Sequence, residues 1–153
     1  MKKLIVIAMI ALMAGMVGSA SATLYTNFTG SATAPGYVAD SVTRVQNTLD
    51  FTATPAAISD IYQVIGVPSN TIVLAVGYDV ITTNTASSTF EIGDGSHGSR
   101  FATNCATATK GGVLASGTAY LYAADDTIDV QAIAALANGK VLVWAVFAAP
   151  PKK

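Results

Sequence analysis

Alternation of apolar and polar residues at a period of two constrains the fold of this chain more than any other feature. The clearest case lies in residues 41–51, where Val45 and Leu49 would face one side and Arg44 and Gln46 the other. This period places successive side chains on opposite faces of a β-strand, whereas a helix needs a period near 3.6 residues. Most of the chain is therefore expected to form strands.

Similar runs recur along the chain, separated by turn residues. Residues 71–83 are apolar on both faces at their centre, which is typical of a strand inside a sandwich. The last run, residues 140–147, carries Trp144 and predicts burial on both sides. Asn138-Gly139 precedes it and favours a tight β-hairpin turn. The predicted strands cover residues 42–51, 61–67, 71–83, 89–92, 100–102, 118–122, 127–133 and 140–147.

These strands predict an all-β fold, a single antiparallel β-sandwich of jelly-roll type with about eight strands. The domain is expected to span residues 41–149, with residues 150–153 as a C-terminal tail. The length suits one domain. The single cysteine, Cys105, leaves no internal disulfide to form, and its small neighbours favour a buried apolar position.

The N-terminus has the pattern of a secretory signal peptide over residues 1–22. Lys2 and Lys3 precede an apolar run that is shorter than the roughly 20 residues needed to span a bilayer. Ala20-Ser21-Ala22 fits the small-residue cleavage site, so the leader is predicted to be helical and removed.

Residues 23–40 are predicted to form an extended arm in front of the sandwich. They mix Gly, Pro, Ser and Thr with isolated aromatic residues, a composition that suits an extended segment better than a core strand. Tyr25, Phe28 and Tyr37 are its expected apolar anchors in assembly.

The charge pattern argues against nucleic acid or a membrane as a partner once the leader is removed. The net charge is −1 for the full chain and −3 once Lys2 and Lys3 leave with the leader (six basic against nine acidic residues), and the basic residues of the domain are scattered along the sequence. Binding to phosphate backbones or anionic lipids needs clustered Lys or Arg.

The sequence predicts no catalytic site. The only histidine, His97, lies in a Gly- and Ser-rich loop, where an exposed polar residue is the ordinary outcome, and no zinc spacing or nucleophile motif accompanies it. No cofactor is therefore expected, apart from calcium at Asp94, Asp125 and Asp126, whose carboxylates lie at turns. These aspartates are equally typical of turns that bond backbone N–H groups.

Tyr120 and Tyr122 form the best candidate pair for an exposed aromatic surface. Such a pair could bind carbohydrate, whereas aromatic residues such as Tyr62, Phe90 and Trp144 lie inside apolar runs and are expected in the core. A secreted carbohydrate-binding or adhesive module is therefore the alternative function.

The order of several segments resembles that of small tailed-phage virion structural proteins of the decoration or fibre type. The resemblance extends over about residues 60–147 and implies a β-sandwich that assembles with other subunits, without catalytic residues. The segments that carry it are Asp60 to Pro68, Thr71 to Thr83, Ser88 to Gly95, Tyr122 to Val130 and Gly139 to Val146.

The expected function is that of a non-enzymatic structural subunit. It would self-assemble into a phage-like particle or into an exported fibre, filament or surface layer, and its arm could add a strand to a neighbour's sheet. The expected partners are further copies of itself and other virion or surface proteins. The leader favours secretion, with the virion as the alternative location.

Overall fold

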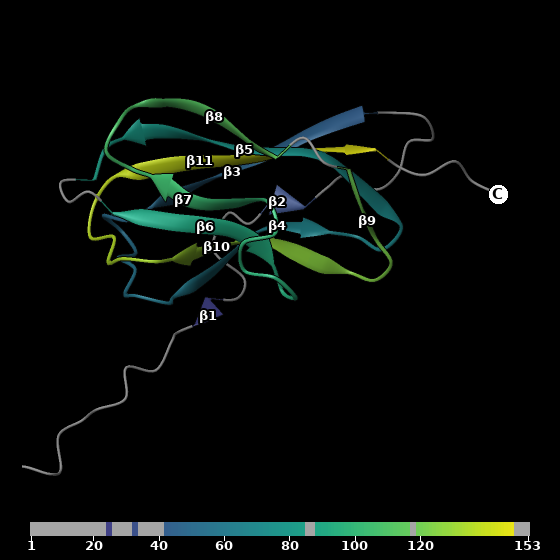
Figure 1. Ribbon diagram of the computed structural model, residues 1–153, viewed down its shortest axis with the longest axis horizontal. Coiled ribbons are helices and arrows are strands. Elements are labelled where there is room, and N and C mark those ends of the chain that lie inside the picture. The colour runs from purple at the N-terminus through teal and green to yellow at the C-terminus, as the bar shows by residue number, and fades with distance from the viewer. Residues whose placement is uncertain (1–23, 26–31, 34–41, 85–87, 117–118, 149–153) are drawn as a thin grey trace, which may run out of the picture.

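The computed structural model describes residues 24–25, 32–33, 42–84, 88–116 and 119–148 as an all-β structure. The predicted leader, most of the arm including Phe28 and Tyr37, and the tail lie outside these residues, as does the side chain of Tyr25. Figure 1 shows the strands in two layers that pack face to face. None of the described residues belongs to a helix long and apolar enough to cross a membrane.

The two layers are a six-stranded sheet, sheet A, and a five-stranded sheet, sheet B. Sheet A contains β1 (Leu24–Tyr25), β2 (Ala32–Thr33), β4 (Ile61–Val67), β6 (Thr89–Asp94), β7 (Ala102–Ala106) and β10 (Asp126–Ala132). Sheet B contains β3 (Val42–Asp50), β5 (Thr71–Thr82), β8 (Gly111–Ser116), β9 (Tyr120–Tyr122) and β11 (Lys140–Ala148). The predicted β-sandwich is confirmed.

The period-two alternation of the sequence becomes the inner and outer faces of these sheets. On β3, Val45 and Leu49 are buried between the layers, while Arg44 and Gln46 are exposed on the other side. Sheet B has the order β3-β11-β5, with β8 and β9 both pairing with β5, so β5 and β11 are interior strands, as their apolar runs predicted.

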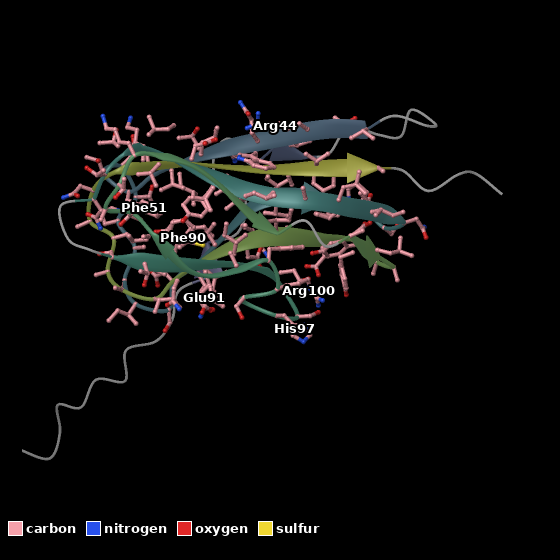
Figure 2. The ribbon with its side chains drawn as sticks, turned by 45° about the horizontal axis from the view of Figure 1, so that its top comes forward. Arg44, Phe51, Phe90, Glu91, His97 and Arg100 are labelled. Atoms are coloured by element: carbon pink, nitrogen blue, oxygen red, sulfur yellow. The ribbon has the colours of Figure 1, made fainter. Side chains whose placement is uncertain are left out.

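Aromatic residues from both sheets fill the space between them. Phe51 and Tyr62 meet edge to face at 5.8 Å between ring centroids, and Tyr78 and Phe90 do the same at 5.1 Å. Figure 2 shows Phe51 and Phe90 between the layers. Such pairs stabilise a core by about 0.5–1.5 kcal/mol beyond the area they bury. Cys105 is also buried, as predicted.

The hairpin predicted at Asn138-Gly139 is wrong. The preceding strand, β10, belongs to sheet A and the following strand, β11, belongs to sheet B, so the segment between them crosses from one layer to the other. Gly139 has a φ of +97°, and its carbonyl accepts a hydrogen bond from the Phe51 N–H at 3.0 Å. The chain does turn at Gly139, but the turn connects a strand of sheet A to a strand of sheet B and not two paired strands.

The described part of the arm pairs with the edge of sheet A. Leu24 and Tyr25 align with Ile61 and Tyr62, and further along β4 Ala32 and Thr33 align with Ile65 and Gly66. Both pairings are parallel, whereas every other ladder between named strands in the described structure is antiparallel. β10 pairs with the opposite edge of β4, so the described arm strands occupy the edge of sheet A on this side.

Candidate functional site

A buried carboxylate, that of Asp94, organises the loop that follows β6. Its Oδ1 accepts hydrogen bonds from the N–H groups of Ser96 at 3.1 Å and His97 at 2.8 Å. Its Oδ2 accepts from Arg100 Nε, in an ion pair, and from the Tyr122 hydroxyl at 2.9 Å. The Asp94 side chain is only 1% exposed. We call Asp94, Arg100, Tyr120 and Tyr122 the Asp94 cluster.

The Asp94 cluster joins the two sheets at one end of the sandwich. Asp94 ends β6 in sheet A, whereas Tyr120 and Tyr122 lie on β9, which pairs with β5 in sheet B. The Arg100 guanidinium lies 3.9 Å from the Tyr120 ring centroid, and the two tyrosine rings meet edge to face at 4.9 Å. The Asp94 carboxylate is therefore held by an ion pair with Arg100 and a hydrogen bond from Tyr122, and the Tyr120 ring packs against the same guanidinium.

The predicted exposed tyrosine pair is wrong, because Tyr122 is 4% exposed and its hydroxyl is bonded to Asp94. Only Tyr120 is partly exposed, and Arg100 covers its ring. This removes the surface on which carbohydrate binding was expected.

The pKa values within the cluster follow from this geometry. Burial alone would raise the pKa of the Asp94 carboxyl, but hydrogen bonds from Arg100, the His97 N–H and Tyr122 outweigh burial, so that pKa is lowered. Burial and the neighbouring Asp94 carboxylate raise the pKa of the Tyr122 hydroxyl. Asp94 is thus held ionised and Tyr122 neutral, as a structural ion pair requires.

A second buried carboxylate, Asp129 on β10, lies beneath the same loop. Asp129 is 5% exposed, and its Oδ1 accepts a hydrogen bond from Thr127 Oγ1 at 2.6 Å. Burial, and to a smaller extent repulsion from Asp126 and Asp94, raise its pKa to about 6, although the Thr127 hydrogen bond opposes the shift. The carboxyl therefore titrates well above an ordinary aspartate.

Gly93 allows the loop to cover this part of sheet A. A Cβ at position 93 would overlap the backbone of His97 and Gly98, so only glycine leaves space for the loop to fold back over β6. Figure 2 shows His97 and Arg100 on the side of the sandwich away from sheet B. His97 itself is exposed, as predicted, and its ring lies 2.8 Å from Arg100 Nη2.

The three aspartates predicted to bind calcium lie in different surroundings. Asp94 is bonded as described above, Asp125 Oδ1 accepts from the Ser69 N–H at 2.7 Å, and Asp126 Oδ1 accepts from the Thr127 N–H at 2.8 Å. Among the described residues, no group of three or more His, Cys, Asp or Glu side chains is arranged to hold a metal ion. Calcium binding stays a prediction that only a titration tests.

A groove of about 520 Å³ opens between β7 and β8, the free edges of the two sheets on one side. Its lining includes Tyr78, Phe101, Asn104, Cys105 and Val113. Burial raises the pKa of Tyr78, and it raises that of Cys105 to about 12. The Tyr78 hydroxyl and the Cys105 thiol in this groove are therefore held in their neutral forms near pH 7.

The outer face of sheet B departs from the prediction for the last strand. Leu142, Trp144 and Val146 on β11 point away from the core and are only partly buried, whereas Val143 and Ala145 are buried between the layers. Trp144, expected in the core, lies on the surface of the sheet with the Arg44 guanidinium 4.9 Å from its ring centroid. This sheet has a second apolar face that no described element covers.

The fold, but no sequence family, is matched by known proteins. No protein-family model matches the chain, and no curated protein matches it in sequence. Three chains from phage capsid structures share its fold, with TM-scores of 0.55–0.61.

The three similar chains come from phages of different hosts. The chain from the acidic stable capsid of Helicobacter pylori bacteriophage KHP30 is 14% identical, over 72% of this chain and 89% of that one, with a TM-score of 0.55. The chain from the cyanophage Pam1 capsid is 20% identical, over 76% and 91%, with a TM-score of 0.61. The chain from the capsid of Ralstonia phage GP4 is 16% identical, over 78% and 92%, with a TM-score of 0.59. This chain thus shares its fold with chains of phage capsids over about three quarters of its length.

Proposed function

We propose that this protein is a non-enzymatic structural subunit that assembles with copies of itself, and with other virion proteins, into a phage-like particle. The observation that carries this proposal is the fold shared with chains of three phage capsids, since each of those chains is matched over about nine tenths of its length. The described carboxylates support it, because Asp94 is engaged in an internal ion pair and Asp129 in an internal hydrogen bond. The predicted leader would open a second possibility, export to an extracellular fibre or surface layer.

The arm is the proposed connector between subunits. Its contacts with β4 are two short parallel ladders at a sheet edge, and the backbone groups of an edge strand accept a strand from any chain that presents one. The same pairing can therefore form within one subunit or between two, as in domain swapping. Removal of the leader after Ala22 would place the free N-terminus directly before Leu24.

A cysteine pair at the arm register tests strand exchange. Leu24 and Ile61 are register partners, so Leu24→Cys with Ile61→Cys should form a disulfide on oxidation. In a Cys105→Ala background these would be the only thiols, because Cys105 is the single native cysteine. We expect a ladder of covalent oligomers on non-reducing gels, and the two single-cysteine variants serve as controls.

A second variant separates exchange from other contacts. Deleting residues 23–40 should reduce the mass of the assembled species to that of a smaller oligomer or a monomer. Oxidised double-cysteine protein that runs only as an internally linked monomer, together with unchanged oligomers after the deletion, would rule out strand exchange.

A further inference from the structure

The outer face of sheet B carries apolar residues on β5, β8, β9 and β11, whereas the outside of a sandwich is normally polar. On β3 only Val42 belongs to this apolar surface, because the other outward residues of that strand are polar. Three large side chains stand well exposed on it, Val42 at 66%, Leu114 at 60% and Leu121 at 55%. Between them lie partly buried apolar residues that also point outward. We name this surface the Trp144 face, and it comprises Val42, Ile72, Leu114, Leu121, Leu142, Trp144 and Val146.

The strand register shows that these residues form continuous rows across the sheet. Trp144 aligns with Gly77, which aligns with Leu114 on β8. At the other end of the face, Ile72 aligns with Leu121 on β9. Register partners point to the same side of a sheet. The exposed leucines on β8 and β9 therefore adjoin the outward residues of β5 and β11 in one continuous surface.

The outer face of sheet A is different. Its outward residues are mainly polar. Gln131 on β10 aligns with Glu91 on β6, and the neighbouring outward residue of β10, Asp129, aligns with Gln63 on β4. Figure 2 shows Glu91 on the side of the molecule opposite to Arg44, which marks the outside of sheet B. The outer face of sheet A is thus typical of a sheet exposed to water. An exposed apolar patch such as the Trp144 face is instead typical of an interaction surface.

Gly77 makes the centre of the Trp144 face flat. A Cβ at position 77 would overlap the Trp144 ring, so the indole lies down on the sheet over the glycine backbone. The Arg44 guanidinium is placed against the same ring at 4.9 Å. Tryptophan and arginine, with tyrosine, are enriched among the residues that contribute most to binding at protein interfaces.

The charges on this face cancel in pairs. Arg44 lies 3.9 Å from Asp79, and Lys140 lies 2.7 Å from Asp50. These pairs leave no net charge for an oppositely charged partner to recognise, and none that would repel an identical copy. A flat, neutral and apolar surface is complementary to itself, which is what an isologous interface between two copies requires.

The face is also large enough for a stable contact between copies. The outer side of sheet B, counted as four neighbouring strands at about 4.8 Å spacing and nine residues at about 3.3 Å rise, covers roughly 20 Å by 30 Å, and it includes the Trp144 face together with the charged and polar residues beside it. Such an area approaches the roughly 800 Å² that each partner buries in a standard interface.

We propose that the Trp144 face packs against the Trp144 face of a second copy of this chain. The two faces would stack at about 10 Å, the distance at which packed sheets meet in sandwiches. This inference rests on the proposed assembly function, since it names the second copy as the partner at that surface. It needs no contribution from the arm.

The single tryptophan reports directly on this contact. Trp144 is the only tryptophan in the chain, so its fluorescence comes from the centre of the face. Raising the protein concentration should shift its emission to shorter wavelengths and lower its quenching by acrylamide. Both changes should follow the rise in mass measured by sedimentation velocity, with the same midpoint.

Paired charge substitutions provide the test and its control. Leu114→Lys with Leu121→Lys should weaken association at least tenfold, because two charges would enter an apolar contact. Ile58→Lys with Ile133→Lys changes two residues that are also exposed, at 62% and 39%, but lie outside the face, and should leave association unchanged. Far-UV circular dichroism and thermal unfolding verify that each variant is folded.

Three results would overturn the proposal. The wild-type chain could stay monomeric at high concentration, its mass could rise without any change at Trp144, or the Leu114/Leu121 variant could associate as tightly as wild type. Failure here leaves strand exchange testable, because the Leu24/Ile61 cysteine ladder reports on the arm alone. If the cysteine ladder is absent but Trp144 still reports association, strand exchange is ruled out and packing of the Trp144 face is supported.

Discussion

At the scale of single residues, the end of the sandwich beside β9 depends on Asp94. Its partners come from positions 6 and 28 residues further along the chain, Arg100 and Tyr122. The sequence placed Asp94 correctly at a turn, through the Gly93-Asp94-Gly95 pattern, but no local signal pairs it with Tyr122. Only the packing of sheet A on sheet B brings that hydroxyl to the carboxylate.

Removing the Tyr122 hydroxyl should destabilise the fold. In Tyr122→Phe, the buried Asp94 carboxylate loses a 2.9 Å hydrogen bond, which should lower the free energy of unfolding by about 1–3 kcal/mol. Urea denaturation measures this change. Tyr120→Phe keeps the ring that contacts Arg100 and should change the same quantity by no more than about 0.5 kcal/mol. Equal effects for both variants would contradict the proposed role of the hydroxyl.

Asp129 should make the protein less stable as the pH rises through the weakly acidic range. Its pKa is about 6 in the folded chain and near 4 in an unfolded one, so between these values only the folded state keeps the proton. The free energy of unfolding should therefore fall from pH 4 to pH 6, by an amount on the order of 2 kcal/mol.

Asp129→Asn should flatten this part of the pH profile and raise stability at pH 7. Below pH 4 the opposite trend should appear, because the lowered pKa of Asp94 gives stability that is lost as its carboxyl is protonated. Chemical denaturation across pH 3–8 measures both slopes. An unchanged slope between pH 4 and pH 6 in the asparagine variant would contradict this assignment.

At the scale of elements, periodicity predicted strands well and their connections poorly. The interior strands β5 and β11 follow from their apolar runs, and the buried residues of β3 follow from alternation. The short β8 was missed because Gly111-Gly112 reads as a break, although those glycines pair with Val80 and Asp79. Sheet membership depends on contacts distant in sequence, so a strong turn signal at Asn138-Gly139 could not separate a hairpin from a crossover.

The loop after β6 should loosen if Gly93 gains a side chain. Gly93→Ala would push the backbone of His97 and Gly98 away from β6 and lower the free energy of unfolding by about 1–3 kcal/mol. Trypsin cleavage after Arg100 should also become faster, because the loop no longer packs on the sheet. Gly98→Ala is the matched control, since its Cβ would meet only the flexible end of Gln131. Similar proteolysis of the two variants would argue against a packed loop.

At the scale of the whole molecule, the two outer surfaces have different characters. Sheet A carries polar residues and a loop fastened by the Asp94 cluster, while sheet B presents the apolar Trp144 face. The sequence predicted Trp144 to be core because an apolar strand reads the same whether a second layer lies within the chain or in a partner. The prediction that Trp144 lies in the core is therefore wrong for the single chain, and burial by a second copy is the proposal made above for this face.

The central claim, that this chain is an assembly subunit, is tested most directly by the mass of the species it forms in solution. The chain beginning at Thr23 would be purified and its mass measured by sedimentation velocity over a wide range of concentration. We expect species of several subunits, with masses that are whole multiples of the chain and that rise with concentration. A monomer at every concentration, up to the highest that stays in solution, would contradict the account.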